Sequence, residues 1–292
     1  MHIDVKKHSY DFDVLESTLS TTKEDIIYLW QPGEVGIPFD LDEIKLLGKR
    51  IGKKIIVILN KDFYYFWAYK TVYHSNEVVG HNKKINKSFT CLNGKKRQYR
   101  SLLVDLFAKE RLIKNNYVSL NLWDWSEDDY VFEYRQNKPL YIDGIDETGY
   151  WNTPACFKDS LFSVVTETYI HDLDFITEKT WLPIYHKRPF IILGPIGVNQ
   201  KLKNLGFEIF EEYFDYTFDN LSARTDIKVK MVVDQIKKVQ HLKFSKERKR
   251  LQDKLEHNHN LLIQKVCSGE WLPNLPIAQG PHAYLLNTLW TS

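Results

Sequence analysis

Short apolar runs that alternate with helical segments constrain the fold of this chain most. Residues 25–30 (DIIYLW) and 54–60 (KIIVILN) have the length and β-branched content of buried strands, and a helical segment around 41–52 separates them. A strand, a helix and a second strand at this short spacing predict a βαβ unit, and hence a parallel sheet. The expected fold class is therefore α/β.

The alternation continues along the rest of the chain and is interrupted only at 124–155, which show no clear period and which we interpret as a linker or an elaborated crossover between domains. It predicts further strands at 88–93, 117–123, 160–168, 189–194 and 207–210, and helices over about 99–112, from 177 onward, at 197–206 and within 222–266. Two successive α/β halves predict two Rossmann-like lobes with an interlobe cleft, which is a natural ligand site. We expect an N-terminal lobe at 1–150, a C-terminal lobe at 151–266, and a tail at 267–292 that packs back on the lobes.

Several classes of protein are disfavoured by what the sequence lacks. The three cysteines are far apart and form no CxxC pair, so neither a disulfide framework nor a zinc site is expected. Asp-x-Asp patterns at 11–13 and 172–174 are too short and common to predict a metal site. His257 and His259 are two apart, which on a helix points them away from each other, so we interpret them as surface residues. No Walker A or GxGxxG motif occurs, which argues against ordinary ATPases and dehydrogenases.

The N-terminus has no apolar core typical of a signal peptide, and no run of about 18 apolar residues occurs. We therefore expect a cytoplasmic protein that does not bind membranes.

A lysine at the start of a predicted helix suggests a phosphate ligand. Thr177 is a favourable N-cap residue, and Glu178 suits the first turn because the helix dipole favours a carboxylate there. The same dipole disfavours the cation of Lys179, and this cost disappears if an anion binds at the helix start. The alternative is an ordinary exposed first turn.

Two arginines repeat this feature. Arg97 and Arg100 lie three residues apart at the start of the helix that follows CLNG, on one helix face. They are also cations at the unfavourable end of a helix, although each could serve surface solubility alone.

The segment 163–194 (SVVTETYIHDLDFITEKTWLPIYHKRPFIILG) resembles the donor-binding core of fucosyltransferase-type glycosyltransferases of the two-lobed GT-B class. Together with the upstream CLNGKKRQYRSLLVDLF, it is also similar to phage- and giant-virus-encoded relatives of these enzymes. The resemblance covers about 88–265. The family's Asn-Ser pair is absent here, and the matching residues are Glu167, Asp174, Thr177, Glu178, Lys179, Arg188, Pro189 and Gly194.

The resemblance implies a nucleotide-sugar donor, a UDP- or GDP-sugar, bound mainly by the C-terminal lobe, with the N-terminal lobe on the acceptor side. Glu178 would bind the ribose, Lys179 the diphosphate, and Glu167 would lie near the donor. Arg97 or Arg100 would reach across the cleft to the pyrophosphate. Such cations would stabilise the charge that develops on a departing diphosphate, so neither a metal nor a further cofactor is expected.

An inverting transfer would also need a general base in the N-terminal lobe. Glu34 is the first candidate and Asp40 the second, because loops after parallel strands face the cleft. Both could equally be solvent-exposed loop acids.

The acceptor is open to several interpretations. Basic blocks at 83–114 and 237–254, together with many aromatic residues, suit nucleic acid. With the phage-like resemblance, 5-hydroxymethylated cytosine in phage DNA, in the host cytoplasm, is the favoured acceptor. A glycan, a lipid-linked sugar or a protein are alternatives, and the basic blocks could serve only the donor and solubility. Two alternative functions are a non-catalytic nucleic-acid-binding protein on the same fold and another nucleotide-using α/β enzyme. The sequence does not indicate the oligomeric state.

Overall fold

The computed structural model divides into two compact units, one formed by Met1–Phe66 with Lys265–Ser292 and the other by Trp67–Gln264. The residues that it describes are 2–4, 12–21, 23, 26–30, 41–57, 67–68, 71–72, 75, 78, 85–94, 97–120, 155–170, 176–221, 224–242 and 244–268. We describe each unit by itself.

The first unit contains a parallel sheet with strand order β1-β2-β3. Its strands are β1 (His2–Asp4), β2 (Ile26–Trp30) and β3 (Lys54–Val57), and its helices are α1 (Phe12–Thr21) and α2 (Leu41–Ile51). The predicted βαβ unit of β2, α2 and β3 is confirmed. The sequence analysis did not anticipate β1 or α1.

The second unit is built on a four-stranded parallel sheet with strand order β5-β4-β6-β7. Its strands are β4 (Lys87–Asn93), β5 (Tyr117–Leu120), β6 (Ser160–Thr166) and β7 (Phe190–Leu193). Every residue of β6 and β7 is buried, as expected for parallel strands covered on both faces. The predicted α/β class with parallel sheets is therefore confirmed.

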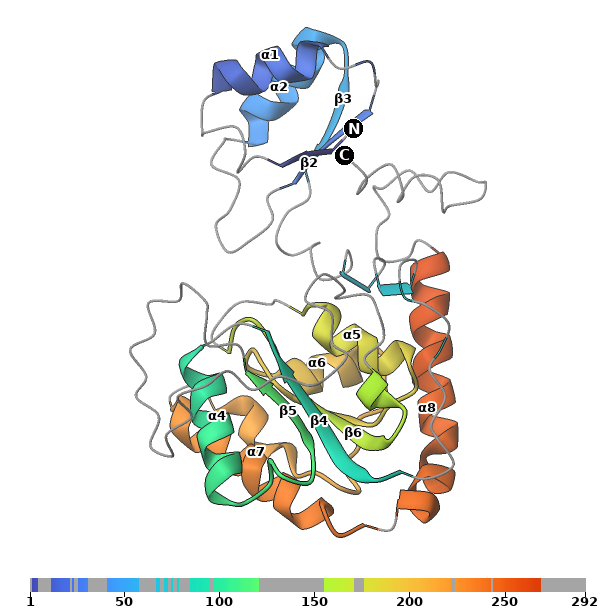
Figure 1. The fold of residues 1–292 in the computed structure, drawn as a ribbon. Helices are drawn as coiled ribbons and strands as arrows, with labels where there is room; N and C mark the ends of the chain where they lie inside the picture. Colours follow the sequence, from blue (N-terminus) through green and yellow to red (C-terminus); the bar gives the residue numbers. More distant parts are fainter. Residues whose placement is uncertain are drawn as a thin grey trace. The chain divides into compact units, whose positions relative to one another are not determined.

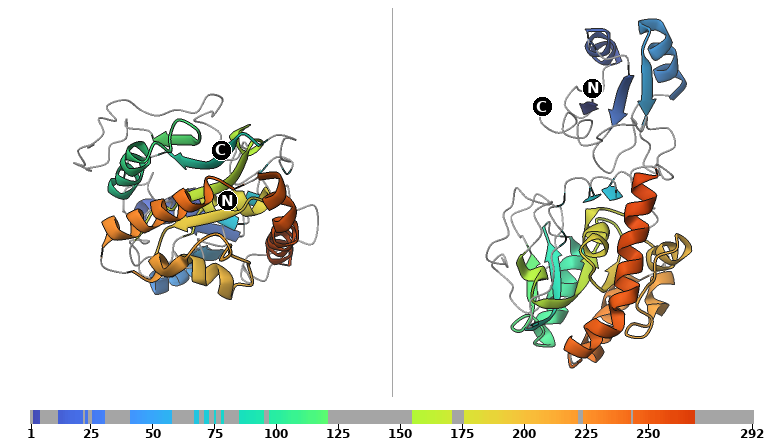
Figure 2. Two further views of the ribbon diagram at one scale, coloured as in Figure 1. Left: turned by 90° about the horizontal axis from the view of Figure 1, so that it is seen from below. Right: turned by 90° about the vertical axis from the view of Figure 1, so that its right-hand side faces the viewer.

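Helices cover this sheet on both faces (Figure 1). They are α4 (Gln98–Lys109), α5 (Glu178–Tyr185), α6 (Val198–Asn204), α7 (Thr225–Val239) and α8 (Phe244–Cys267), with short 3-10 turns at Ala155–Phe157 and Tyr216–Asn220. Helix α4 packs against α7, and α5 packs against β6 and β7. Figure 2 shows α8 running along the outside of the unit.

The strand order reverses between β4 and β6. The chain moves from β4 to β5 in one direction and from β6 to β7 in the other, so right-handed crossovers place α4 and α5 on opposite faces of the sheet. In open α/β sheets, ligands bind outside the carboxyl ends of the strands at such a reversal. The ends of β4 and β6 are therefore the place to look for a site.

The two units do not follow the expected division near residue 150. Strands β4 and β5 were expected in the N-terminal lobe, but β4 pairs with β6 along Lys87↔Ser160 to Thr90↔Ser163. Sequence distance misled the prediction, because the aperiodic residues 124–155, which lie between these strands, were interpreted as a linker or an elaborated crossover between domains. Residues 121–154, and the tail beyond 268, lie outside the described part of the chain.

The structure lacks one strand predicted in the second unit and divides one predicted helical region. The strand expected at 207–210 is absent, because side chains satisfy its backbone: Asn258 bonds to both backbone groups of Glu208, and the Phe210 amide donates to the Tyr216 hydroxyl. The long helical region predicted at 222–266 consists of two helices, α7 and α8.

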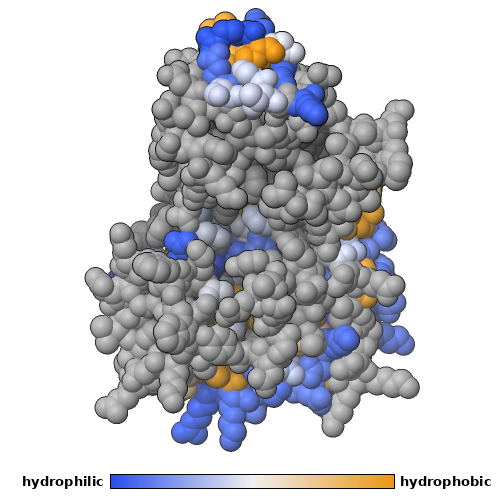
Figure 3. Space-filling model, turned by 45° about the horizontal axis from the view of Figure 1, so that its top comes forward, coloured by the Kyte–Doolittle hydropathy of each residue, from blue (hydrophilic) through white to orange (hydrophobic). Residues whose placement is uncertain are grey.

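The surface of the described part carries few large apolar side chains. Among the residues coloured by hydropathy in Figure 3, the hydrophobic areas are small and lie beside hydrophilic residues. Among the described residues, the exposed large hydrophobic side chains are Leu46, Val78, Leu221 and Ile227.

Histidine side chains of helix α8 hydrogen-bond to backbone carbonyls elsewhere in the second unit. His257 Nε2 lies 2.8 Å from the Gly206 carbonyl, and His259 Nδ1 lies 2.6 Å from the Tyr185 carbonyl. Our interpretation of both histidines as surface residues is therefore only half right, since His259 is partly buried against the end of α5. Nearby, burial, Arg188 and His259 together lower the pKa of His186 to about 3.

The buried histidines predict a stability loss in mild acid. The pKa of His186 is depressed in the folded state, so the unfolded chain, with a histidine pKa of about 6.5, binds more protons between these values. Unfolding free energy should therefore fall as pH drops from 7 towards 4, by up to about 1.4 kcal/mol per pH unit for this histidine. Urea unfolding of wild type and His186→Gln at pH 7, 6 and 5 checks this; equal slopes in the two proteins would contradict it.

Candidate functional site

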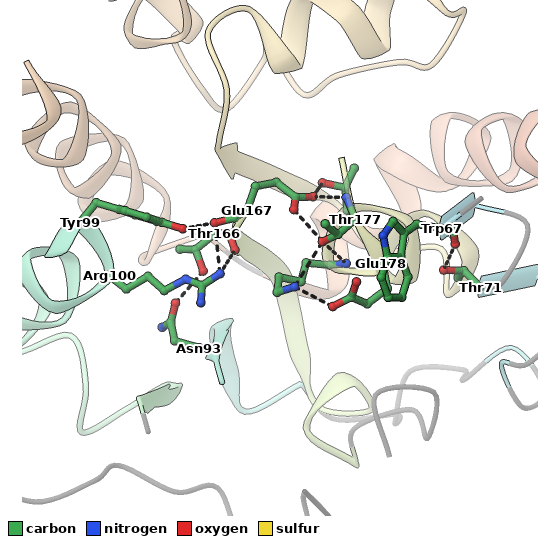
Figure 4. A network of polar contacts seen from close by, with 11 residues as sticks. Trp67, Thr71, Asn93, Tyr99, Arg100, Thr166, Glu167, Thr177 and Glu178 are labelled. Carbon is green, nitrogen blue, oxygen red and sulfur yellow. Dashed lines mark hydrogen bonds and ion pairs between the residues drawn. The ribbon is translucent and has the colours of Figure 1, made fainter. Parts of the chain in front are cut away.

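A polar network occupies the carboxyl ends of β4 and β6, where the strand order reverses (Figure 4). The Thr166 hydroxyl, at the end of β6, donates to Asn93 Oδ1, at the end of β4, over 2.6 Å. The Asn93 amide in turn donates to the Ser119 carbonyl of β5 over 2.9 Å. Three adjacent strand ends are thereby held together by side-chain hydrogen bonds.

Glu167 follows β6 directly and is the centre of this network. Its side chain is fully buried, and its carboxylate accepts hydrogen bonds from the Thr177 amide at 3.0 Å and from the hydroxyls of Thr177 and Thr180, each at 2.6 Å. A buried carboxylate is tolerated only where donors replace its water, and the amino end of a helix also favours its charge. Glu167 is thus the anion at the start of α5.

A glycine makes room for this side chain. A Cβ added to Gly194, which follows β7, would lie 3.2 Å from both Cβ and Cγ of Glu167. That is closer than ordinary van der Waals contact, so position 194 accommodates Glu167 best as glycine.

The backbone carbonyl of Glu167 binds side chains of α4. It accepts hydrogen bonds from the Tyr99 hydroxyl and, at 3.1 Å, from Arg100 Nη2, which also donates to the Thr166 carbonyl at 3.0 Å. Arg100 is only 2% exposed, so its guanidinium anchors α4 to the end of β6. Burial raises the pKa of Tyr99 to about 12, which keeps its hydroxyl a donor at neutral pH. Figure 4 shows Tyr99 and Arg100 on one side of Glu167 and Thr177 on the other.

Glu178 and Lys179 form an ion pair in the first turn of α5. Lys179 Nζ lies 2.6 Å from Glu178 Oε1 and 3.3 Å from Thr177 Oγ1. The carboxylate side chain is 5% exposed and the lysine side chain 22% exposed, so the ammonium is the accessible partner. Thr177 is the N-cap, as predicted, because its hydroxyl accepts from the Lys179 amide.

These contacts correct the argument that cations at helix starts require a bound anion. The Glu178 carboxylate already pairs with Lys179, and backbone carbonyls accept hydrogen bonds from Arg100. The Thr177 amide is likewise taken by Glu167 rather than offered to a phosphate. A ligand phosphate at this place would therefore bind the Lys179 side chain, not the helix amides alone.

Arg97 precedes α4 and is half-buried. Its guanidinium carbon lies 5.8 Å from the centroid of the Tyr169 ring, within range of a cation–π contact. Arg97 and Arg100 belong to the same compact unit as Glu167 and Lys179, so neither would reach a pyrophosphate from an opposite lobe, as the resemblance implied for at least one of them.

Three predicted residues cannot be placed in the site, and three residues of the network were not predicted from the sequence. Glu34, Asp40 and Asp174 lie outside the described residues. The sequence analysis missed Asn93, Tyr99 and Thr180, although their positions carried a signal. Asn93 ends a predicted strand, Tyr99 adjoins Arg100, and Thr180 lies one helical turn after the N-cap.

The described part of the chain offers neither a cluster of metal ligands nor, among its buried cysteines, a thiol of lowered pKa. No group of three or more His, Cys, Asp or Glu side chains there could hold a metal ion. Cys91, Cys156 and Cys267 are free, and burial raises the pKa of the first two thiols to about 12, so they are protonated at neutral pH. Among the described helices, none is both long enough and apolar enough to cross a membrane.

Comparisons with known proteins add no relative: no protein-family model, no curated protein and no solved structure matches this chain.

The hydrogen bonds to Glu167 predict a measurable stability effect. Thr180→Val keeps the β-branched shape but removes one donor to a buried carboxylate, which should lower the unfolding free energy of the second unit by about 1.5–3 kcal/mol. Thr217→Val, at an exposed position, is the matched control and should change it by less than about 0.5 kcal/mol. Denaturant unfolding followed by circular dichroism checks both, and equal effects would contradict the assigned contact.

Proposed function

We propose that this protein is a nucleotide-sugar-dependent glycosyltransferase, with two Rossmann-like lobes in a GT-B-like arrangement and the donor on the second unit. The observation that supports it best is the Glu178–Lys179 ion pair beside the reversal in strand order. This edge of an open parallel sheet is where nucleotides bind in many unrelated α/β proteins.

A nucleotide could separate Glu178 from Lys179 and give each of the two charged groups a new partner. Ribose hydroxyls would donate to the Glu178 carboxylate, and the diphosphate would accept from the Lys179 ammonium. Because Glu178 is buried, breaking the pair without such replacements would be costly. The pair is therefore suited to a ligand that carries hydroxyls and an anion close together.

The reaction would proceed by attack of an acceptor hydroxyl on the anomeric carbon of the sugar. A new carbon–oxygen bond forms, the bond from the anomeric carbon to the diphosphate breaks, and the diphosphate leaves with the electron pair. The hydroxyl proton passes to a carboxylate, for which we propose Glu34 or Asp40. Lys179, and Arg97 from the start of α4, would stabilise the charge that develops on the diphosphate.

The basic block at 237–254 favours a polyanionic acceptor over a second role in donor binding. The Gln240 carbonyl, at the end of α7, accepts from the Ser88 hydroxyl near the start of β4, so the first part of this block lies at the amino ends of the strands, whereas Glu178 follows their carboxyl ends. Lys237 and Lys254 are engaged by acidic side chains, whereas Lys238, Lys246 and Lys249 are exposed. We therefore keep 5-hydroxymethylated cytosine in DNA as the proposed acceptor.

Donor binding is tested by thermal shift with UDP- and GDP-sugars. A ligand at about 100 times its dissociation constant should stabilise the native state by about 2.7 kcal/mol. Lys179→Met should strongly reduce the shift, because the diphosphate loses one of the two cations proposed to bind it. Lys203→Met, which breaks the exposed ion pair with Glu211, is the matched control and should retain it. If no nucleotide sugar shifts the wild type, the proposal fails.

The DNA acceptor is tested by its salt dependence. Binding of a duplex containing 5-hydroxymethylcytosine should fall by orders of magnitude between 50 and 200 mM salt, because phosphate neutralisation releases counterions. Lys246→Gln combined with Lys249→Gln should weaken binding and flatten this dependence. Absence of duplex binding at 50 mM salt would reject DNA and leave a glycan or protein acceptor.

A further inference from the structure

Glu167 connects the two segments that carry Arg97 and Lys179, the partly exposed cations of the candidate site. Its carbonyl holds Tyr99 and Arg100 of α4, the helix that Arg97 precedes. Its carboxylate holds Thr177 and Thr180, which flank Lys179. One residue therefore fixes both α4 and the first turn of α5 to the end of β6.

The carboxylate also determines how Thr177 presents itself to Lys179. The Thr177 hydroxyl has a single hydrogen, and it donates this hydrogen to Glu167 Oε2 over 2.6 Å. Its lone pairs are left for Lys179, whose amide and ammonium nitrogens lie 3.4 and 3.3 Å from Thr177 Oγ1. The position of the ammonium thus depends on the carboxylate through one hydroxyl.

We propose that Glu167 is a positioning residue, which sets the place of the Lys179 ammonium for diphosphate binding without touching the ligand. This inference rests on the proposed function and replaces the expectation that Glu167 lies against the donor, because its side chain is fully buried behind Thr177 and Thr180.

The direction of a mutational effect distinguishes positioning from simple electrostatics. Removal of the negative charge of Glu167 would by itself tighten anion binding, because it removes the repulsion between that charge and the anion. Loss of the hydroxyl orientation would instead weaken binding, since an amide in place of the carboxylate can donate to Thr177 Oγ1 and reverse the hydroxyl. A positioning role therefore predicts weaker anion binding from Glu167→Gln, although the variant carries less negative charge.

The experiment is a double-mutant cycle on binding. Affinities for UDP, GDP and inorganic pyrophosphate are measured by titration calorimetry for wild type, Glu167→Gln, Lys179→Met and the double variant. Glu167→Gln should weaken binding on the order of tenfold, as is typical when the support of a ligand-binding side chain is removed. In the Lys179→Met background it should have no further effect, because it acts through that ammonium.

Asp219 supplies the matched control. Its carboxylate is 2% exposed and caps α6 by accepting from the amides of Asn199 at 2.9 Å and Gln200 at 3.1 Å. Asp219→Asn removes a buried helix-capping charge of the same kind in the same unit. It should lower stability without changing the affinity for UDP, GDP or pyrophosphate.

Each outcome separates the inference from the proposed function. Unchanged or tighter binding by Glu167→Gln, or additive effects in the cycle, overturns the positioning role while the function stands. Pyrophosphate binding without nucleoside diphosphate binding overturns the function, and the same cycle on pyrophosphate still decides the role of Glu167. If the wild type binds none of the three, both are overturned. Should Glu167→Gln fail to fold, Thr177→Val, which removes the hydroxyl between Glu167 and the Lys179 ammonium, takes its place in the cycle with the same expected loss of affinity.

Discussion

The buried carboxylate of Glu167 is the interaction on which the second unit depends most. A charge without access to water is stable only where donors surround it, and Thr177 and Thr180 supply those donors at the amino end of α5. The same residue binds α4 through its carbonyl, so the two helices on opposite faces of the sheet meet at one point. Gly194 leaves the space that this arrangement requires.

The network also explains why Lys179 is found in the first turn of a helix. The dipole of α5 is opposed by Glu167, and the ammonium is paired with Glu178, so the local field that should disfavour the lysine is offset by two carboxylates. The lysine is nonetheless the more exposed member of the pair. This ion pair, with a buried acid and a more exposed base, is the feature on which we base the proposal of a nucleotide ligand.

Much of the fold could be predicted because its signals are local. The buried runs that form β2, β6 and β7 are continuous in the sequence, and the Thr-Glu-Lys turn identified the N-cap of α5. Predictions failed where side chains far apart in the chain decide the outcome. The segment 207–210 has the composition of a strand, but Asn258 satisfies its backbone from α8. Strand β4 was assigned to the wrong unit because its pairing with β6 spans some seventy residues.

The sequence by itself determined the α/β class and, apart from β1, the approximate positions of the strands in both parallel sheets. It also singled out Arg100, Glu167, Thr177, Glu178 and Lys179, because periodicity and capping act over a few residues. Only the tertiary structure decided what these residues do for one another. Whether Glu167 faces a ligand or a helix, and whether Arg100 is exposed or bound to carbonyls, depends on which strand ends become neighbours, and strand order follows from contacts between distant segments.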